Sequence, residues 1–390
     1  MTIHLHIAFL TAISSIAYVL SMYTLDRLLL LSERLGLDFL IYFLRILTQP
    51  WGLLLSVLMI LIYFLVAKVV SVRWARPIGW LSGSWMGYLA LTLFYAGPLH
   101  LIELALSFLN LDSGTMITIL SQVSLIAVHL GLVYGIWNAS RQPLLKVVDI
   151  KDRRIGQDLN QFKILQLSDI HIGPTLGRSF VKKLHTLCQR VQANLIVMTG
   201  DLVDGEVRFL GDEVKEFLSL EQYAEHGLLL ITGNHEYISG AQEWVDFINQ
   251  VGGQILENEH RNIQVGRDTL SVIGIEDWDA HKFDSQRMPS LEKAMHALPS
   301  NSYKLLLAHQ PKAAPQAADL GIDLQLSGHT HAGQIFPFNF LIYLDQPYNV
   351  GLYQIKQLKL YVNPGTGYWG PPVRIGTRAE ATLLTLHHDP

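Results

Sequence analysis

Five short clusters of Asp, His and Asn recur along the second half of the chain. They are Asp169-Ile170-His171, Gly200-Asp201-Leu202-Val203-Asp204, Gly233-Asn234-His235-Glu236, His309, and Gly328-His329-Thr330-His331. Carboxylates and neutral imidazoles are good ligands for divalent Mn, Fe or Zn, and an Asn carbonyl adds an oxygen ligand without charge. Two cations about 3.5–4 Å apart need a bridging ligand, and a carboxylate such as Asp201 can bridge them. The residue types therefore predict a site for two divalent cations.

An apolar segment typical of a β-strand precedes each cluster. These segments are Phe162–Leu167, Leu195–Met198, Leu228–Ile231, Tyr303–Leu307 and Asp323–Leu326, and helical patterns lie between most of them. Alternating strands and helices predict a sheet covered by helices on both faces, with ligands at the carboxyl ends of the strands. In Asp-x-His and His-x-His, an extended backbone would point both side chains to one face. Glycines at 200, 233 and 328 would permit sharp turns and close backbone approach.

The ordered series of clusters resembles the calcineurin-like metallophosphoesterase superfamily, whose pattern is D-x-H, G-D-x-x-D, G-N-H-[DE], an isolated H, and G-H-x-H. The resemblance covers residues 160–390 and implies an α/β domain built on a β-sandwich flanked by helices. It implies that one metal is held by Asp169, His171 and His331, that a second is held by Asn234, His309 and His329, and that Asp201 bridges them. It also implies that His235 faces the substrate and protonates the leaving oxygen, that Asp204 orients His235, and that Glu236 supports the ligands from behind.

The first part of the chain has a different character. Residues 1–140 hold only 6 of the 29 Lys/Arg and 5 of the 33 Asp/Glu. The charge-free runs 1–25, 46–67, 77–102 and 113–140 each reach the roughly 20 residues that cross a bilayer. We expect four spanning helices near 3–23, 47–67, 80–99 and 116–138. For residues 26–46 we expect an amphipathic interfacial helix rather than a fifth span.

The predicted organisation is therefore a multi-span helical membrane domain at 1–140, a linker at 141–159 and an α/β metallophosphoesterase sandwich at 160–390. The positive-inside rule favours a cytoplasmic catalytic domain on an integral, multi-pass protein, which the resemblance places in the bacterial inner membrane. The net charge of −4 argues against a nucleic-acid partner. A single cysteine, Cys188, excludes an internal disulfide and a multi-cysteine zinc site.

Together these features predict metal-dependent hydrolysis of a phosphoester by a hydroxide that two cations activate. The substrate could be a phosphomonoester, a phosphodiester or a lipid-linked pyrophosphate; the last comes from the resemblance to membrane-associated members of the superfamily. The aromatic stretch at 335–353 suggests a loop suited to a lipid phosphate, or simple packing. The rival interpretations are a non-catalytic membrane receptor or anchor whose metal site binds a phosphate ligand, and a transporter.

Some residues carry weaker signals. Arg374 could pair with a substrate phosphate, although a structural role is favoured. Asp277, Asp279 and His281 could form a third metal site, but the five clusters already supply the ligands for two metals, so a third site is not expected. Glu103, Gln122 and His129 lie in or beside expected spans, where interhelical hydrogen bonding is the favoured interpretation.

Overall fold

The computed structural model describes residues 3–111 and 114–389. These residues form two compact units. A helical unit comprises the N-terminal helices together with Gly370–Ile375. An α/β unit comprises chiefly residues 141–369 and 376–389. The short segment Gly370–Ile375 thus leaves the α/β unit near its C-terminal end and packs with the helices.

Five helices make up the helical unit: α1 (Ile3–Arg34), α2 (Asp38–Leu47), α3 (Pro50–Val69), α4 (Val72–Phe108) and α5 (Gly114–Ser140). Within the described residues, α4 and α5 are each long and apolar enough to cross a membrane. The pair α2–α3, bent by 78°, could be one further span. These helices cover the spans expected near 47–67, 80–99 and 116–138. The span expected near 3–23 falls largely on side chains outside the described part, so four spans stay a prediction.

The segment expected as one amphipathic helix at 26–46 is divided between two helices. Gly36 adopts a φ of 63°, and Leu37 N donates to Ser32 O at 3.1 Å while Gly36 N donates to Glu33 O at 3.3 Å. This is a Schellman termination, which a glycine at positive φ allows without steric cost. Residues 26–34 therefore belong to α1, and α2 begins only at Asp38.

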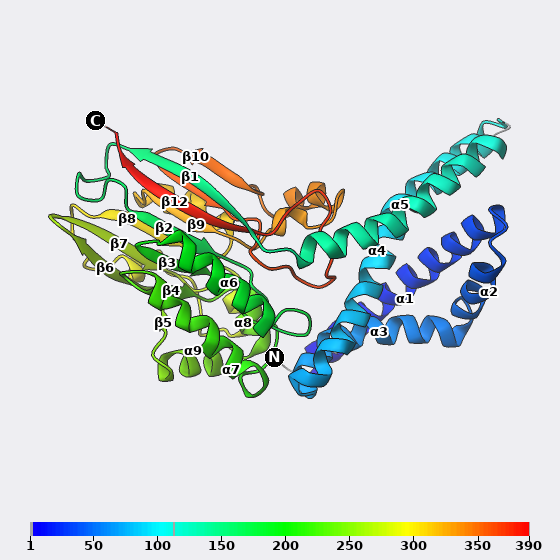
Figure 1. Ribbon diagram of the computed structural model, residues 1–390, viewed down its shortest axis with the longest axis horizontal. Helices are drawn as coiled ribbons and strands as arrows, with labels where there is room; N and C mark the ends of the chain where they lie inside the picture. Colours follow the sequence, from blue (N-terminus) through cyan, green and yellow to red (C-terminus); the bar gives the residue numbers. More distant parts are fainter. Residues whose placement is uncertain (1–2, 112–113, 390) are drawn as a thin grey trace. The chain divides into compact units, whose positions relative to one another are not determined.

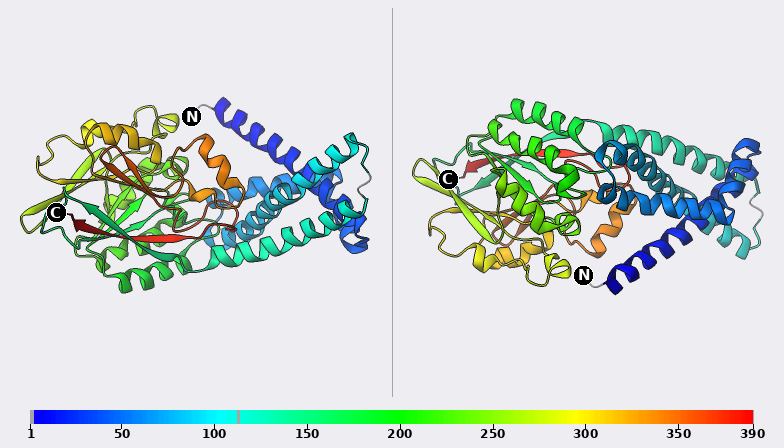
Figure 2. Two further views of the ribbon diagram at one scale, coloured as in Figure 1. Left: turned by 90° about the horizontal axis from the view of Figure 1, so that it is seen from above. Right: turned by 90° about the horizontal axis from the view of Figure 1, so that it is seen from below.

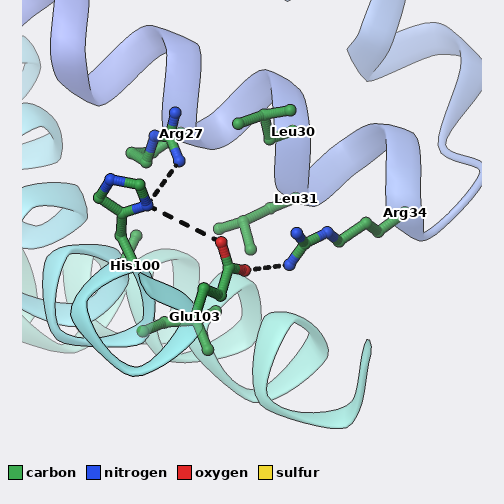
Figure 3. Close-up of a pocket in the computed structure, with 8 residues that line it drawn as sticks. Arg27, Leu30, Leu31, Arg34, His100 and Glu103 are labelled. Atoms are coloured by element: carbon green, nitrogen blue, oxygen red, sulfur yellow. Dashed lines mark hydrogen bonds and ion pairs between the residues drawn. The ribbon is translucent and has the colours of Figure 1, made fainter. Parts of the chain in front are cut away.

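Charged side chains join α1 to α4 (Figure 3). Arg27 Nη1 lies 2.9 Å from His100 Nδ1, and Arg34 forms an ion pair with Glu103. The cavity that they line holds only about 10 Å³, roughly the space of one water molecule. Glu103 is therefore an interhelical ion-pair partner. His129 of α5 likewise lies 3.3 Å from the hydroxyl of Tyr88 in α4, in line with the interhelical role expected for it.

The α/β unit contains two six-stranded sheets (Figure 1). The first has the strand order β1 (Leu144–Asp152), β12 (Glu380–His388), β2 (Lys163–Leu167), β3 (Leu195–Thr199), β4 (Leu228–Ile231) and β5 (Gln254–Ile255). The second has the order β10 (Gly351–Ile355), β11 (Leu358–Val362), β9 (Leu324–Ser327), β8 (Tyr303–Leu307), β7 (Asp268–Gly274) and β6 (Glu259–Val265).

The two sheets pack face to face. One buried cluster takes Ile164, Val197 and Leu229 from the first sheet and Leu305 and Leu324 from the second. The single sheet expected from strand–helix alternation is therefore wrong, and the sandwich implied by the family resemblance is confirmed. Alternation could not reveal the division, because strands buried on both faces show the same continuous apolar pattern in either arrangement.

Helices cover the outer faces of the sandwich. Helices α6 (Arg178–Val191) and α7 (Val207–Leu218) contact each other, and α7 contacts α9 (Ala241–Gln250). The right-hand view of Figure 2 shows green helices of this unit lying over its strands. A second buried cluster joins α11 (Leu291–Ala294) and α12 (Ala314–Asp319) to the second sheet. The short helices α8 (Asn234–Ser239) and α10 (Ala280–Phe283) complete the unit.

The stretch expected as a linker contains a strand. Strand β1 pairs in parallel with β12 along its whole length, from Leu144 opposite Glu380 to Asp152 opposite His388. β12 in turn runs antiparallel to β2. The chain therefore enters the first sheet within a few residues of the end of α5, and its last strand lies between two earlier ones (Figure 1). Strand β1 was not predicted because residues 141–159 are polar and basic. Such a composition fits β1, since it is an edge strand that is exposed along much of its length.

Candidate metal centre

The predicted ligands lie at the carboxyl ends of five strands, three from the first sheet and two from the second. Asp169 and His171 follow β2, Asp201 and Asp204 follow β3, and Asn234 and His235 open α8 directly after β4. From the second sheet, His309 follows β8, while His329 and His331 follow β9. The structure thus brings all nine predicted site residues to one end of the sandwich.

Among the described residues, three overlapping groups of potential ligands converge there: one is His171, Asp204 and His235, and the other two consist only of predicted metal ligands. In the first of these two, His331 Nε2 lies 3.1 Å from His171 Nε2 and 3.4 Å from Asp169 Oδ1. In the second, His309 Nε2 lies 3.2 Å from Asp201 Oδ2 and 3.3 Å from His329 Nδ1. Each group places three potential ligand atoms within 4.8 Å of one another. Asp201 links the groups, because its Oδ2 also lies 3.8 Å from His171 Nε2.

Asn234 supplies an independent test of whether a cation fits. Its side-chain oxygen is buried and accepts no hydrogen bond. A buried carbonyl oxygen without a partner costs about 1–3 kcal/mol, so such an atom calls for an explanation. A neutral oxygen ligand to a cation is one that the chemistry of the surrounding carboxylates and imidazoles supports.

The backbone at the ligands differs from the extended geometry expected for Asp-x-His and His-x-His. Positive φ angles occur at Asp169 (52°), His171 (52°), Asp201 (58°), His329 (72°) and His331 (49°). Such a conformation costs a non-glycine residue about 1–2 kcal/mol, and it is found where function requires it. The ligands are therefore aimed by sharp left-handed turns at the strand ends rather than by the alternation of a strand.

The three predicted glycines allow the loops to approach closely. A Cβ at Gly233 would lie 2.2 Å from Asp201 Oδ1, and one at Gly200 would lie 2.7 Å from His309 Nδ1. A Cβ at Gly328 would lie 1.9 Å from Ser168 Oγ and 2.2 Å from Asp169 Oδ2. Only glycine fits these positions without moving a predicted ligand.

Hydrogen bonds fix which imidazole nitrogen faces the cluster. His309 Nδ1 lies 2.7 Å from Thr199 O, a carbonyl that can only accept, so Nδ1 carries a proton and Nε2 is the nitrogen that faces Asp201 and His329. Asp204 Oδ1 binds both His171 Nδ1 at 3.0 Å and His235 Nδ1 at 2.6 Å. A single carboxylate thereby holds the Nδ1 atoms of two histidines and leaves the Nε2 atom of each available, that of His171 for a predicted metal and that of His235 for a substrate. His235 Nε2 lies 4.0 Å from Asp201 Oδ2.

Glu236 supports the Asp201 loop. Its carboxylate accepts hydrogen bonds from four backbone amides, those of Asp201, Leu202, Val203 and Gly233, at 2.6–3.1 Å. The donors belong to the loops that follow β3 and β4. Glu236 thus holds both loops in register, the supporting role that the resemblance implied.

Burial and mutual charge shift the acidities of these groups. Burial would raise the pKa of Asp201, but His309 and His235 outweigh it and hold that pKa well below the usual value. Asp204 has its pKa lowered in the same way, by His171 and His235 against its burial. Burial would lower the pKa of His235, yet Asp201 and Asp204 raise it to about 9. Burial and the charge of His309 lower the pKa of His329 to about 3, which keeps this ring neutral.

Two weaker candidates from the sequence, a possible third metal site and Arg374, lie outside this centre. In the described part of the chain, Asp277, Asp279 and His281 do not form a metal-binding group; Asp277 instead accepts from Gln310 Nε2 at 3.0 Å, next to His309. Burial raises the pKa of Asp277 to about 6. Arg374 is fully buried in the helical unit, as the structural interpretation expects.

Sequence reasoning missed several residues that support the site. Ser168 donates to Asp169 Oδ2 at 2.5 Å, and Thr199 orients His309. Trp369 places its ring centroid 5.5 Å from that of His235. Ser168 and Thr199 adjoin the Asp169 and Asp201 clusters and could have been flagged by position alone. Trp369 carries no such signal, because it lies more than 130 residues from His235.

Comparisons with known proteins agree with this geometry. The sequence pattern of the family described as calcineurin-like phosphoesterase matches residues 162–333. An uncharacterized metallophosphoesterase of Campylobacter jejuni is 33% identical over 343 residues, which cover 84% of this chain and 88% of that one.

Two vertebrate relatives are similar over a shorter stretch. Each is called transmembrane protein with metallophosphoesterase domain: that of Danio rerio is 35% identical over 263 residues, 65% of this chain, and that of Bos taurus is 37% identical over 270 residues, 66% of this chain. In both cases the match spans about 60% of the relative's own length.

Proposed function

Because this chain belongs to the calcineurin-like phosphoesterase family, we propose that it hydrolyses a phosphoester at the cluster formed by the five strand ends. The observation that carries the proposal is that Asp204 holds two histidines to which we assign different roles. This carboxylate holds His171, a predicted metal ligand, and His235, to which we assign the role of proton donor. A site that only bound phosphate would not require a positioned proton donor.

The predicted ligands fit two divalent cations. Asp169, His171 and His331 would hold one, Asn234, His309 and His329 would hold the other, and Asp201 would bridge them. The orphaned oxygen of Asn234 and the neutral ring of His329 support this assignment. Bound cations of the Mn, Fe or Zn type would supply Lewis acidity to phosphoryl oxygens and lower the pKa of water.

His235 would act as the proton donor to the leaving oxygen. Its Nδ1 is held by Asp204, which leaves Nε2 as the atom that faces a substrate. The raised pKa of His235, about 9, supports a protonated ring at neutral pH. A general acid placed in this way contributes about 10²- to 10⁴-fold to the rate.

We propose a membrane-borne phosphoester as the substrate. The segment that follows His331 carries exposed apolar side chains, among them Phe340 (62% exposed), Leu341 (48%) and Leu344 (85%). Exposed apolar patches of this kind mark interaction sites with lipids or other apolar partners. Replacing these three residues with Ser should reduce turnover of a phosphoester in lipid vesicles and spare that of a soluble ester. Equal turnover of the vesicle substrate would rule out this role for the segment.

The experiment that tests the proposed hydrolysis is a substrate screen with purified protein and Mn²⁺. It would compare p-nitrophenyl phosphate, bis(p-nitrophenyl) phosphate and lipid phosphates, using the wild type, Asp201→Ala and His235→Ala. We expect turnover that falls by about 10²-fold or more in His235→Ala and vanishes in Asp201→Ala. Phosphate binding without turnover in the wild type would favour a receptor. Substrate flux that survives Asp201→Ala would favour a transporter.

We further propose that α4 and α5 anchor the chain in a membrane as part of a multi-pass helical domain. The apolar length of both helices and the vertebrate relatives' name support membrane association. The charge pattern favours a cytoplasmic catalytic unit, and the resemblance to membrane-associated bacterial phosphoesterases favours the bacterial inner membrane.

A further inference from the structure

Trp369 lies beside the proposed proton donor. Its ring meets the ring of His235 edge to face, at a centroid distance of 5.5 Å and an angle of 71°. The side chain is nevertheless 41% exposed. An exposed indole beside the group that would protonate the leaving oxygen presents an apolar surface where the leaving group must lie.

The backbone of Trp369 is fastened to the loop that carries the last predicted ligand. Gln334, three residues after His331, accepts from Trp369 N through its Oε1 at 3.0 Å and donates from its Nε2 to Trp369 O at 2.8 Å. Thr377 donates its hydroxyl to the backbone carbonyl of Gln334 at 3.1 Å. Gln334 therefore forms hydrogen bonds with the chain at Trp369 and again at Thr377.

The residues before Trp369 are fastened to the first predicted ligand. Thr366 N donates to Ser168 O at 2.7 Å, and Gly367 N donates to Asp169 O at 3.0 Å. A Cβ at Gly367 would lie 2.3 Å from Ile170 O, so this approach is as close as the backbone permits. Trp369 is thus tied to the β2 loop on one side and to the β9 loop on the other.

The residues after Trp369 are fixed within the helical unit. Arg374 N donates to Gly135 O at 3.0 Å, and Asn138 Nδ2 donates to Arg374 O at 3.0 Å. Val373 fills the space left by two glycines: a Cβ would lie 2.7 Å from its side chain at Gly87 of α4 and 2.4 Å from it at Gly135 of α5. Val373 and Arg374 are fully buried.

We propose that Trp369 determines substrate specificity by contacting the leaving alcohol of the phosphoester. This inference rests on the proposed hydrolysis and adds to it the class of leaving group, an apolar or aromatic alcohol.

The test uses two soluble substrates that differ in apolar area but have leaving alcohols of similar acidity, 1-naphthyl phosphate and phenyl phosphate. We expect the full-length wild type with Mn²⁺ to favour the naphthyl ester in kcat/KM by about three- to tenfold, the size of one aromatic contact. Trp369→Ala should abolish this preference mainly through KM, with bound metal unchanged. Trp369→Phe should retain part of it. Melting temperature and metal content, measured for each variant, identify one that has failed to fold.

The outcomes separate the two proposals. If the wild type hydrolyses neither ester nor any lipid phosphate, the proposed function fails. If it hydrolyses both esters without a naphthyl preference, or with one that survives Trp369→Ala, the role of Trp369 is refuted while hydrolysis stands.

Discussion

At the scale of single residues, Glu236 has the clearest structural consequence. Its two carboxylate oxygens accept from four backbone amides. In Glu236→Gln one of the oxygens becomes an NH₂ group, which cannot accept, so two amides lose their partner. Each unsatisfied buried group costs about 1–3 kcal/mol. We expect a clear drop in melting temperature together with weaker Mn²⁺ binding by titration calorimetry.

The exposed residue Glu243 supplies the control. Glu243→Gln removes the same charge from the same stretch of chain but leaves those four amides paired, so stability and Mn²⁺ affinity should match the wild type. Equal effects of the two substitutions would mean that net charge, and not the amide contacts, supports the site.

A second residue-scale prediction concerns Gly328. Gly328→Ala would place a methyl group on Ser168 Oγ and Asp169 Oδ2, so Asp169 must move. We expect loss of Mn²⁺ binding and of activity. Gly321→Ala, at a φ of 73° and with open space around it, should cost about 1–2 kcal/mol of stability and leave activity intact. An active Gly328→Ala would show that the approach of the loops is looser than the structure indicates.

The predicted ligand types and their order could be obtained from the sequence because each cluster is short and follows its own strand pattern. The backbone conformation at the ligands could not be predicted from the sequence. Asp169 and His331 are ordinary L-residues, and nothing local requires them to adopt φ values of 52° and 49°. Those angles are imposed by contacts with distant loops, such as the amide of His329 that donates to Asp169. Trp369 was missed because its contact with His235 is likewise made between loops that are distant in the sequence.

At the scale of elements, an ion cluster joins the two sheets of the sandwich. Asp152 at the end of β1 binds Arg154, and Arg154 Nη1 in turn donates to Asp323 beside β9 at 2.6 Å. Lys359 of β11 also donates to Asp152, at 3.1 Å. Burial would raise the pKa of Asp152, but Arg154 and Lys359 outweigh it and lower that pKa to about 2.

This lowered pKa predicts a dependence of stability on pH. A carboxylate whose folded pKa lies below its unfolded pKa of about 3.9 stabilises the fold above that pH and loses the effect as pH falls toward 2. The shift of Asp152 corresponds to about 2 kcal/mol. Burial raises the pKa of Asp323, so that group contributes in the opposite sense. Urea unfolding at pH 7, 4 and 3, in the presence of a chelator, should show the loss in the wild type.

Asp152→Asn should be less stable than the wild type at pH 7 and should lose less between pH 4 and pH 3. Asp149, on the same strand, pairs with His387 but has a side chain that is 59% exposed, where such a pair contributes little, so Asp149→Asn should change the pH profile far less than Asp152→Asn. If Asp152→Asn has the acid sensitivity of the wild type, the ion cluster is not its source.

The elements themselves could be predicted where their pattern is strong and local. The strands β2, β3, β4, β8 and β9 match the expected apolar segments closely. Strand β1 could not be predicted because it is partly exposed and because its partner β12 lies more than 230 residues away in the sequence. The break between α1 and α2 depends on one glycine at positive φ, which competes with an otherwise continuous helical pattern.

At the scale of the whole molecule, the chain passes twice between its units. It leaves the helical unit after α5 to enter β1, and it returns for only six residues, Gly370–Ile375, before β12. The sequence alone does not predict the second passage. Glycines are common in apolar helices, and only the fold shows that Gly370–Ile375 packs against four of them, Gly83, Gly87, Gly131 and Gly135. Sequence reasoning treated residues 160–390 as one continuous domain for this reason.

The membrane topology gives the last prediction. If α5 crosses the bilayer once, the turn before it and the α/β unit after it lie on opposite faces, and the charge pattern favours the cytoplasm for the α/β unit. The sole cysteine, Cys188, is buried, so Cys188→Ala gives a background for single-cysteine labelling. Asn110, before α5, and Asn301, in the α/β unit, are both exposed. In intact bacterial cells with a permeabilised outer membrane, an impermeant maleimide should label Asn110→Cys and should label Asn301→Cys only after lysis. The reverse pattern would place the α/β unit outside the cytoplasm, and labelling of both before lysis would mean that α5 does not span the membrane.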